Sequence, residues 1–217
     1  MSEFTMWSQK YQPTCLDECV LEGFPKHVEM TLRKIEQSSQ MPNLLLFGIA
    51  GTGKSTIARV LSSEQKYQVI WKNGSLLSKA DVPDLIKHAS ASTLFGSPKV
   101  VFIDEADGMS HPAQFALRSA IEPRVRASWL LTCNFRKKLI EPIASRFMQI
   151  ECSLPPSSER QSHIAGIVRR CQQILHAEGI DNVSDSEVEA ILSDKYPDIR
   201  QTINELQLRY SFLAIAA

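Results

Sequence analysis

The sequence has few features of a membrane, secreted or disordered protein. Its 217 residues include only 9 glycines and 11 prolines, while 43% are hydrophobic and 22% are charged, a profile typical of a packed globular protein. The longest apolar stretch, residues 44–50, is far shorter than the roughly 18 residues that a membrane-spanning helix needs. Residues 1–7 lack the apolar core of a signal peptide. We therefore expect a soluble protein that is not secreted and has no membrane partner.

Net charge and cysteine pairs are absent as well. The 24 lysines and arginines balance 24 aspartates and glutamates, so no overall positive field attracts nucleic acid, and such a partner must bind a local patch. The five cysteines contain no CxxC pair, which argues against a zinc ribbon and against a disulfide framework. Cys15 and Cys19 have CxxxC spacing, but no histidine or cysteine nearby completes a set of zinc ligands.

Apolar runs alternate with helical patterns up to residue 151. This alternation is typical of a parallel sheet covered by helices, and several runs are apolar at consecutive positions, as in strands buried on both faces. Five strands are predicted at residues 43–48, 67–73, 99–104, 128–133 and 148–151. Helices are predicted between them at residues 54–64, 82–88 and 112–122.

The alternation ends at residues 154–158, where two prolines stop the last strand. The remaining pattern is helical only, with helices predicted at residues 159–178, 184–192 and 199–214. The second of these begins with the capping-box spacing Ser184-x-x-Glu187. We predict an α/β domain over residues 1–153, followed by a small all-helical domain over residues 154–217.

Residues 48–55, Gly-Ile-Ala-Gly-Thr-Gly-Lys-Ser, match the phosphate-binding loop G-x-x-x-x-G-K-[ST] at every fixed position. They lie between a predicted strand and a predicted helix, which is the context that the motif requires. The glycines let consecutive backbone N–H groups face phosphate oxygens. Lys54 can reach the β- and γ-phosphates of a nucleotide, and the Ser55 hydroxyl can bind Mg²⁺.

A second motif ends the strand predicted at residues 99–104, where Asp104 is followed by Glu105. The carboxyl ends of parallel strands meet at one edge of a sheet, so we expect both carboxylates to lie beside the phosphate loop. Asp104 can bind Mg²⁺, and Glu105 can orient and deprotonate a water aimed at the γ-phosphate. The pair therefore predicts hydrolysis of a nucleoside triphosphate and not binding alone.

Residues 104–107, Asp-Glu-Ala-Asp, also spell the signature of a large helicase superfamily. That architecture needs two recombinase-like domains and a Ser-Ala-Thr tripeptide on the next strand, so we do not favour it for this sequence. The next predicted strand ends instead at Asn134, which can hold the attacking water or touch the γ-phosphate. Arg146 precedes the fifth strand, where we expect it to be exposed, and Arg200 begins the last helix. Each arginine alone is typical of an ordinary surface charge.

The order of these motifs resembles that of the AAA+ ATPases, and within them the small subunit of sliding-clamp loaders of the replication factor C and tailed-phage type. The order is the phosphate loop, an Asp-Glu strand, a Thr-x-Asn strand, Ser-Arg before a short strand, and Pro-Asp-x-Arg-x-x-Ile-Asn in the helical part. The resemblance covers residues 9–208. It implies a five-stranded parallel sheet flanked by helices and followed by a helical lid.

Three further segments resemble clamp loaders. Residues 10–13, Lys-Tyr-Gln-Pro, resemble the family's Lys-Tyr-Arg-Pro box beside the adenine, with Gln12 in place of the arginine. Residues 73–75, Asn-Gly-Ser, resemble the turn after the second strand. Residues 114–122 resemble the helix that connects the catalytic site to neighbouring subunits and DNA.

The resemblance also implies a role for each site residue. Asn134 is implied as a sensor of the γ-phosphate, Arg200 as a contact to the γ-phosphate from the lid, and Arg146 as an arginine finger for the neighbouring subunit. Phe147 replaces the cysteine of the family's Ser-Arg-Cys triplet, which leaves the finger assignment standing. Such a finger contributes roughly 10³ to 10⁵ in rate, so we expect an isolated subunit to hydrolyse ATP slowly. The implied nucleotide contacts are Lys10, Tyr11 and Val20 at the base and Gly51, Thr52, Gly53, Lys54, Ser55 and Thr56 at the phosphates.

The function implied by the resemblance is that of a Mg²⁺- and ATP-dependent ATPase subunit. Its partners are other loader subunits, a sliding clamp that it opens, and primer-template DNA. The alternatives are a helicase loader, a branch-migration motor, or a structural subunit that binds nucleotide without turnover. The family's third, helical collar domain is expected to be absent from this chain. The implied compartment is the cytoplasm of a bacterial or phage-infected cell, or the nucleus of a eukaryote.

DNA contact is implied only by the resemblance. The candidates are Lys79, Lys87 and the basic run at residues 136–138, each of which alone is typical of a solvated surface charge. Because the chain has no net charge, we expect its own binding to DNA to be weak and strongly salt-dependent.

Overall fold

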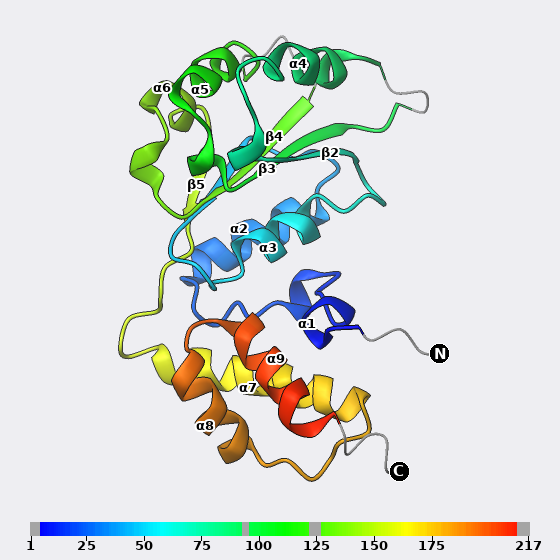
Figure 1. The fold of residues 1–217 in the computed structure, drawn as a ribbon, viewed down its shortest axis with the longest axis vertical. Helices are drawn as coiled ribbons and strands as arrows, with labels where there is room; N and C mark the ends of the chain where they lie inside the picture. The colour runs from blue at the N-terminus through cyan, green and yellow to red at the C-terminus, as the bar shows by residue number, and fades with distance from the viewer. Residues whose placement is uncertain (1–4, 93–95, 122–126, 212–217) are drawn as a thin grey trace.

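A computed structural model describes residues 5–92, 96–121 and 127–211. It contains the predicted five-stranded parallel sheet, with the strands in the order β2-β3-β4-β1-β5 (Figure 1). The strands are β1 (Leu44–Phe47), β2 (Gln68–Asn73), β3 (Lys99–Asp104), β4 (Ala127–Cys133) and β5 (Met148–Glu151). Because all five run in the same direction, their carboxyl ends share one edge of the sheet.

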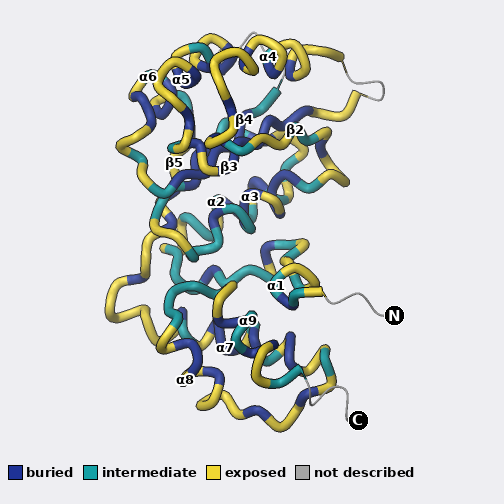
Figure 2. Tube along the Cα trace, viewed as in Figure 1, coloured by how far each residue is buried: buried dark blue, intermediate teal, exposed yellow. Residues whose placement is uncertain are grey.

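The sheet is covered by helices on both faces (Figure 1). In β3, Val101 and Ile103 pack against one helical layer, while Val100 and Phe102 pack against the other, because successive side chains of a strand point to opposite faces. Every residue of β3, which lies between β2 and β4, is buried (Figure 2). The first layer contains α4 (Val82–Ser90), α5 (His111–Arg118) and α6 (Glu141–Ala144), and the second contains α2 (Lys26–Gln37) and α3 (Lys54–Leu61).

The helix α2 was not predicted from the sequence. Its buried residues Leu32 and Ile35 and the half-buried Val28 lie at helical spacing, but no side-chain cap marks its start at Pro25. The helix α5 begins at His111, one residue before its predicted start, where the Ser110 side chain caps it, and it ends at Arg118, earlier than predicted. The last residue predicted for this helix, number 122, lies outside the described residues.

The helices α7 (Arg160–Ala177), α8 (Asp185–Lys195) and α9 (Ile199–Tyr210) pack around a separate hydrophobic cluster. The predicted capping box is confirmed: the Glu187 N–H donates to Ser184 Oγ at 3.4 Å, and the Ser184 N–H donates to Glu187 Oε2 at 2.8 Å. The last residues predicted for the final helix, 212–214, lie outside the described residues. We call this three-helix unit the lid.

The N-terminal segment crosses from the lid to the sheet. Its short helix α1 (Trp7–Lys10) lies between the two (Figure 1). Trp7 is buried in the hydrophobic cluster of the lid, whereas Leu16 and Leu21 are buried in the cluster beneath the sheet. The sequence analysis grouped this segment with the sheet, so its packing with the lid is a finding of the structure.

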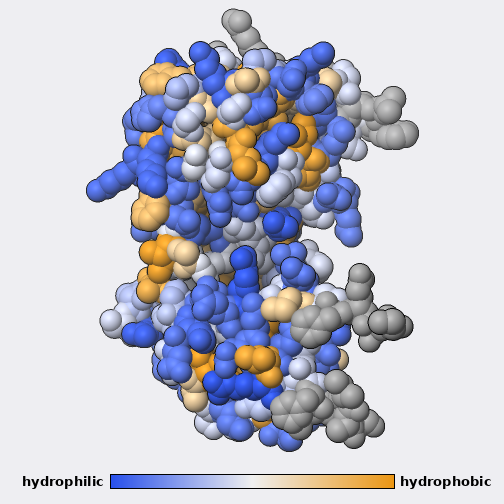
Figure 3. Space-filling model, in the orientation of Figure 1, coloured by the Kyte–Doolittle hydropathy of each residue, from blue (hydrophilic) through white to orange (hydrophobic). Residues whose placement is uncertain are grey.

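The surface shown in Figure 3 is mainly hydrophilic, with apolar side chains in small separate patches. In the described part of the chain, no helix is long and apolar enough to cross a membrane. Among the residues that the structure describes, the exposed large apolar side chains are Met30, Ile49, Trp71, Leu76, Phe115, Phe135, Met148, Leu154 and Leu208.

Candidate nucleotide-binding site

A cavity of about 300 Å³ lies where the sheet edge, the N-terminal segment and the lid meet. Its walls come from the N-terminal segment, the phosphate loop before α3, the carboxyl ends of β3 and β4, and the start of α9. The structure thus gathers residues that are far apart in the sequence. The predicted site residues that line the cavity are Tyr11, Val20, Gly51, Thr52, Gly53, Lys54, Ser55, Thr56, Asp104, Glu105, Asn134 and Arg200.

The phosphate loop depends on glycine for its conformation. Gly51 and Gly53 have φ angles of +84° and +77°, in the left-handed region that side chains disfavour. Lys54, the first residue of α3, is only 8% exposed, and its Nζ donates to the Ile49 carbonyl at 2.5 Å. Burial lowers the pKa of Lys54 from its ordinary value. The ammonium group is therefore held within its own loop, at the cavity wall.

The carboxylate of Asp104 is joined to the phosphate loop by hydrogen bonds. Ser55 Oγ donates to Asp104 Oδ1 at 2.7 Å, and the Thr132 hydroxyl on β4 donates to the same oxygen. The Thr132 hydroxyl also accepts from the Glu105 N–H at 3.1 Å. Thr132 received no role from the sequence, although the Thr-x-Asn pattern contained it. It connects the two acidic residues to the neighbouring strand.

Glu105 has an unusual backbone conformation. Among the described residues it is the one non-glycine residue with a positive φ, at 54°. Its N–H bond to Thr132 and the Gly108 N–H donating to its carbonyl at 2.8 Å hold this conformation in place. Its exposed carboxylate accepts from Asn73 Nδ2 at 3.4 Å. Such a backbone outlier in a cavity supports a functional role for the side chain.

The oxygen atoms of Ser55 and Asp104 suit Mg²⁺. This ion prefers oxygen ligands, and proteins usually hold it through one or two side chains while water and phosphate supply the rest. The hydroxyl and the carboxylate are adjacent at 2.7 Å, and both residues line the cavity beside the phosphate loop. The residues present therefore fit a magnesium ion bound together with a nucleotide.

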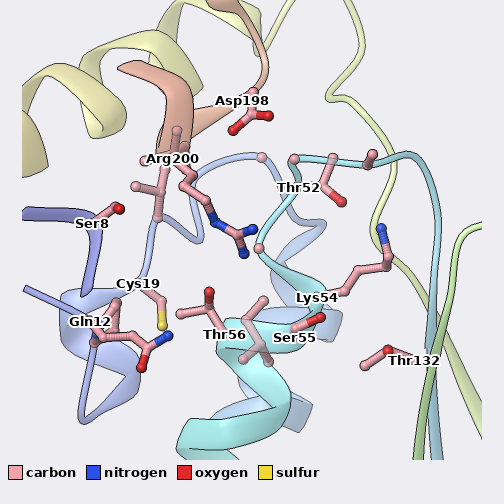
Figure 4. Close-up of a pocket in the computed structure, with 18 of the residues that line it drawn as sticks. Ser8, Gln12, Cys19, Thr52, Lys54, Ser55, Thr56, Thr132, Asp198 and Arg200 are labelled. Carbon is pink, nitrogen blue, oxygen red and sulfur yellow. The ribbon is translucent and has the colours of Figure 1, made fainter. Parts of the chain in front are cut away.

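The end of the cavity away from the phosphate loop contains Gln12, which belongs to the box that resembles the family's segment beside the adenine, and three side chains to which the sequence gave no role at the nucleotide. Ser8, Gln12 and Cys19 on the N-terminal segment and Arg170 on α7 line it beside Tyr11 (Figure 4 labels the first three). Burial raises the pKa of Cys19 to about 12, so this residue is a thiol at neutral pH. No local motif marks Arg170, because its partner, the Tyr11 carbonyl, lies 159 residues away in the sequence.

Lys10 is not among the residues that line the cavity, and the nucleotide contact that the resemblance implied for it stays a prediction. Its Nζ donates to Glu178 Oε1 on the lid at 2.7 Å and lies 5.1 Å from the centre of the Tyr11 ring. The structure thus gives Lys10 a link to the lid.

The lid reaches the phosphate loop through the start of α9. Asp198 caps this helix by accepting from the Gln201 N–H at 3.0 Å. A Cβ atom placed on Gly51 would lie 3.0 Å from Asp198 Cα, so the lid and the loop are in direct contact. The exposed Arg200 side chain points from α9 into the cavity, toward the start of α3 (Figure 4).

Arg146 does not line the cavity of its own chain. It lies just before β5, and its guanidinium donates to the Pro142 carbonyl. The sequence predicted an exposed residue here, whereas Arg146 is half-buried. Of the candidates for DNA contact, Lys79 and Lys87 are exposed, whereas Arg136 is half-buried and forms an ion pair with Glu141 at 2.9 Å.

Comparison with known proteins gives two family matches. The family described as "ATPase family associated with various cellular activities (AAA)" matches residues 44–154. The family described as "Sliding-clamp-loader large subunit, AAA+ ATPase lid domain" matches residues 159–214. The limits at 153 and 154 predicted for the two domains stay a prediction.

Individual relatives give the same result. "Replication factor C small subunit 2" of Pyrobaculum aerophilum is 35% identical over 96% of this chain and 64% of its own length. "Sliding-clamp-loader large subunit" of Enterobacteria phage T4 is 32% identical over 91% of this chain and 62% of its own length. The chain thus spans less than two thirds of these relatives.

Among solved structures, a variant of RuvB from Thermotoga maritima superposes with a TM-score of 0.71 and 20% identity, over 95% of this chain and 67% of that one. At this identity the likeness shows the fold, which is that of the predicted sheet and lid. The phosphate loop, the acidic pair and the family match over the sheet agree, and the helical part is similar to the lid of sliding-clamp-loader subunits. This chain therefore belongs to the AAA family of ATPases.

Proposed function

We propose that this chain is an ATP-hydrolysing subunit of a sliding-clamp loader. ATP binding and hydrolysis would control the opening of a clamp and its placement on primer-template DNA. The single observation that carries the proposal is the cavity, which brings the phosphate loop, the acidic pair, Asn134 and the lid residue Arg200 together. The match of the helical part to a clamp-loader lid favours this function over a helicase loader or a branch-migration motor.

The phosphate end of the cavity would bind the triphosphate. Lys54 supplies positive charge, while Ser55 and Asp104 hold Mg²⁺, which neutralises charge on the phosphate oxygens when bound. Glu105 orients the attacking water and accepts its proton, because its carboxylate is exposed at the same cavity wall. Asn134 and Arg200 contact the γ-phosphate from the sheet and from the lid.

We infer that Arg146 acts on a nucleotide bound to a neighbouring subunit. Its place before β5, outside the lining of its own cavity, supports this role. The proposed partners are accordingly other loader subunits, arranged so that each supplies an arginine to the next. A sliding clamp and primer-template DNA complete the assembly, in the cytoplasm or the nucleus according to the cell.

The test is ATP hydrolysis by mixed variants. Wild-type chain should hydrolyse Mg-ATP, and Glu105→Gln and Arg146→Ala alone should each lose turnover by about 100-fold or more. Mixing the two should restore part of the activity. The site of an Arg146→Ala chain keeps its Glu105, and a neighbouring Glu105→Gln chain can supply the missing Arg146. Arg33→Ala, which removes a half-buried, ion-paired arginine on α2 outside the cavity lining, is the matched control and should behave as wild type.

A mixture no more active than the sum of its parts would contradict the action of Arg146 in a neighbouring subunit. Stimulation of hydrolysis by a ring-shaped clamp and primed DNA separates a clamp loader from the other AAA machines. Bound ATP without turnover in every mixture, including wild type with clamp, would instead indicate a structural subunit.

A further inference from the structure

The N-terminal segment is anchored to the lid by several independent contacts. Trp7 is 3% exposed and lies in the hydrophobic cluster of the lid. The Trp7 N–H donates to Gln207 Oε1 at 2.8 Å, and Gln207 Nε2 donates to the Thr5 carbonyl at 3.0 Å. Lys10 forms its ion pair with Glu178 at 2.7 Å. Residues 5–10 therefore pack as part of the lid.

Arg170 adds a contact at the point where this segment enters the cavity. Its Nη2 donates to the Tyr11 carbonyl at 2.9 Å, and Arg170 and Tyr11 both line the cavity. The neighbouring Arg169 has a different environment: it faces Glu22, with which it forms an ion pair, and does not line the cavity. Arg170 is thus the arginine of α7 that fixes the backbone of Tyr11.

We propose that Arg170 is a positioning residue for the base of the nucleotide, so that the lid holds the nucleotide at both ends. Tyr11, fixed by Arg170, presents the base-facing segment, while Arg200 reaches the phosphates from the same lid. A hydrogen bond from a charged donor is strong enough to hold a backbone segment in this way. This inference rests on the proposed nucleotide site.

Arg170 and Arg200 should then have different effects on ligand affinity. ATP and ADP share the base, so removal of the Arg170 side chain should lower the affinities for both by the same factor. Tripolyphosphate lacks the base, and its affinity should not depend on Arg170. A general loss of structure around the cavity would weaken all three ligands together.

The experiment compares Arg170→Met with Arg169→Met in the full chain, with ATP, ADP and tripolyphosphate each competing against a fluorescent adenine nucleotide. Arg170→Met should weaken ATP and ADP by about 10-fold and leave tripolyphosphate within about 2-fold. Arg169→Met should leave all three within about 2-fold. Arg170→Lys, which keeps a cationic donor, should restore part of the loss.

Equal weakening of all three ligands by Arg170→Met would overturn the inference, and so would no weakening at all. Hydrogen exchange without nucleotide gives a second measurement, at the amides of Lys10 and Tyr11, which donate to the carbonyls of Met6 and Trp7. Exchange there should accelerate in Arg170→Met and not in Arg169→Met. If wild-type chain binds none of the ligands, the proposed function fails, while the exchange rates still decide whether Arg170 fixes this segment.

Discussion

The phosphate end and the base end of the cavity are built in different ways. At the phosphate end, Lys54 and Asp104 are 8% and 9% exposed and are bonded within the loop and the adjoining strand ends. At the base end, the contacts join residues 159 and 168 positions apart, from Tyr11 to Arg170 and from Lys10 to Glu178. The phosphate end is therefore held mainly by local contacts of the loop and the strand ends, whereas the base end is held by contacts between the N-terminal segment and the lid.

This difference between the two ends predicts which variants weaken the binding of every ligand and which change the preference among ligands. Changes on the sheet side should remove binding of every phosphate-containing ligand, because no other part of the cavity replaces the loop. Changes on the lid side should alter the preference among ligands, because the lid contacts only parts of the nucleotide. A ligand can favour one arrangement of lid and sheet only through contacts that differ between the arrangements.

The largest effect is expected for Lys54→Met. Affinity for ATP, ADP and tripolyphosphate should fall together by about 100-fold or more, since a charged donor to phosphate is lost. Unfolding stability should not fall, because burial lowers the pKa of Lys54 and its charge is thus unfavourable in the folded chain. Ligand competition and denaturant unfolding measure the two quantities.

The control is Lys34→Met, which removes an exposed lysine on α2 that does not line the cavity. It should bind all three ligands as wild type does. Binding of ADP at wild-type affinity in Lys54→Met would contradict the claim that no other part of the cavity replaces the phosphate loop.

A smaller and more selective effect is expected for Arg200→Gln. Affinity for ATP should fall by about 10-fold while affinity for ADP stays within about 2-fold, because Arg200 is proposed to contact the γ-phosphate, which ADP lacks. Arg209→Gln is the matched control on the same helix, since that arginine pairs with Glu205 and does not line the cavity. Equal loss of ATP and ADP would place Arg200 elsewhere on the nucleotide.

The same contrast explains what the sequence could and could not predict. The apolar run of β3 and the glycine spacing of residues 48–55 are local signals, and both led to the correct fold and to the correct edge of the sheet. Arg170 had no such signal, because its hydrogen bond depends on a lid helix packing against the N-terminal segment. The ion pair of Lys10 with Glu178 had no such signal either, because its two residues are brought together only by the packing of the N-terminal segment on the lid.

Two features had a weak signal in the sequence, and their roles became clear only in the structure. Thr132 stood within a recognised pattern, but only the register of β4 beside β3 shows that its hydroxyl bonds to Asp104. The helix α2 was missed because it begins after Pro25 without a side-chain cap, and its amphipathic spacing alone did not reveal it.

The smallest effect is expected for Tyr196→Phe, which tests how firmly the lid holds the Arg200 helix. Tyr196 precedes α9, and its hydroxyl shares a 2.9 Å hydrogen bond with Nδ1 of His163, a buried residue of α7 that lines the cavity. The Arg160 guanidinium lies 4.8 Å from the centre of the same ring, and this contact survives in phenylalanine. The variant should lose about 1 kcal/mol of unfolding free energy.

The functional effect of this variant should be a preference for ATP over ADP reduced by about 2-fold, because Arg200 is then held less firmly. Tyr67→Phe is the control: it removes a buried hydroxyl bonded to the Ser38 carbonyl at 3.4 Å, beneath the sheet and outside the cavity lining. In an Arg200→Gln background, Tyr196→Phe should leave the ATP preference unchanged, because the side chain that it positions is already absent. A further reduction in that double variant would show that Tyr196 acts on the nucleotide by a route that does not include Arg200.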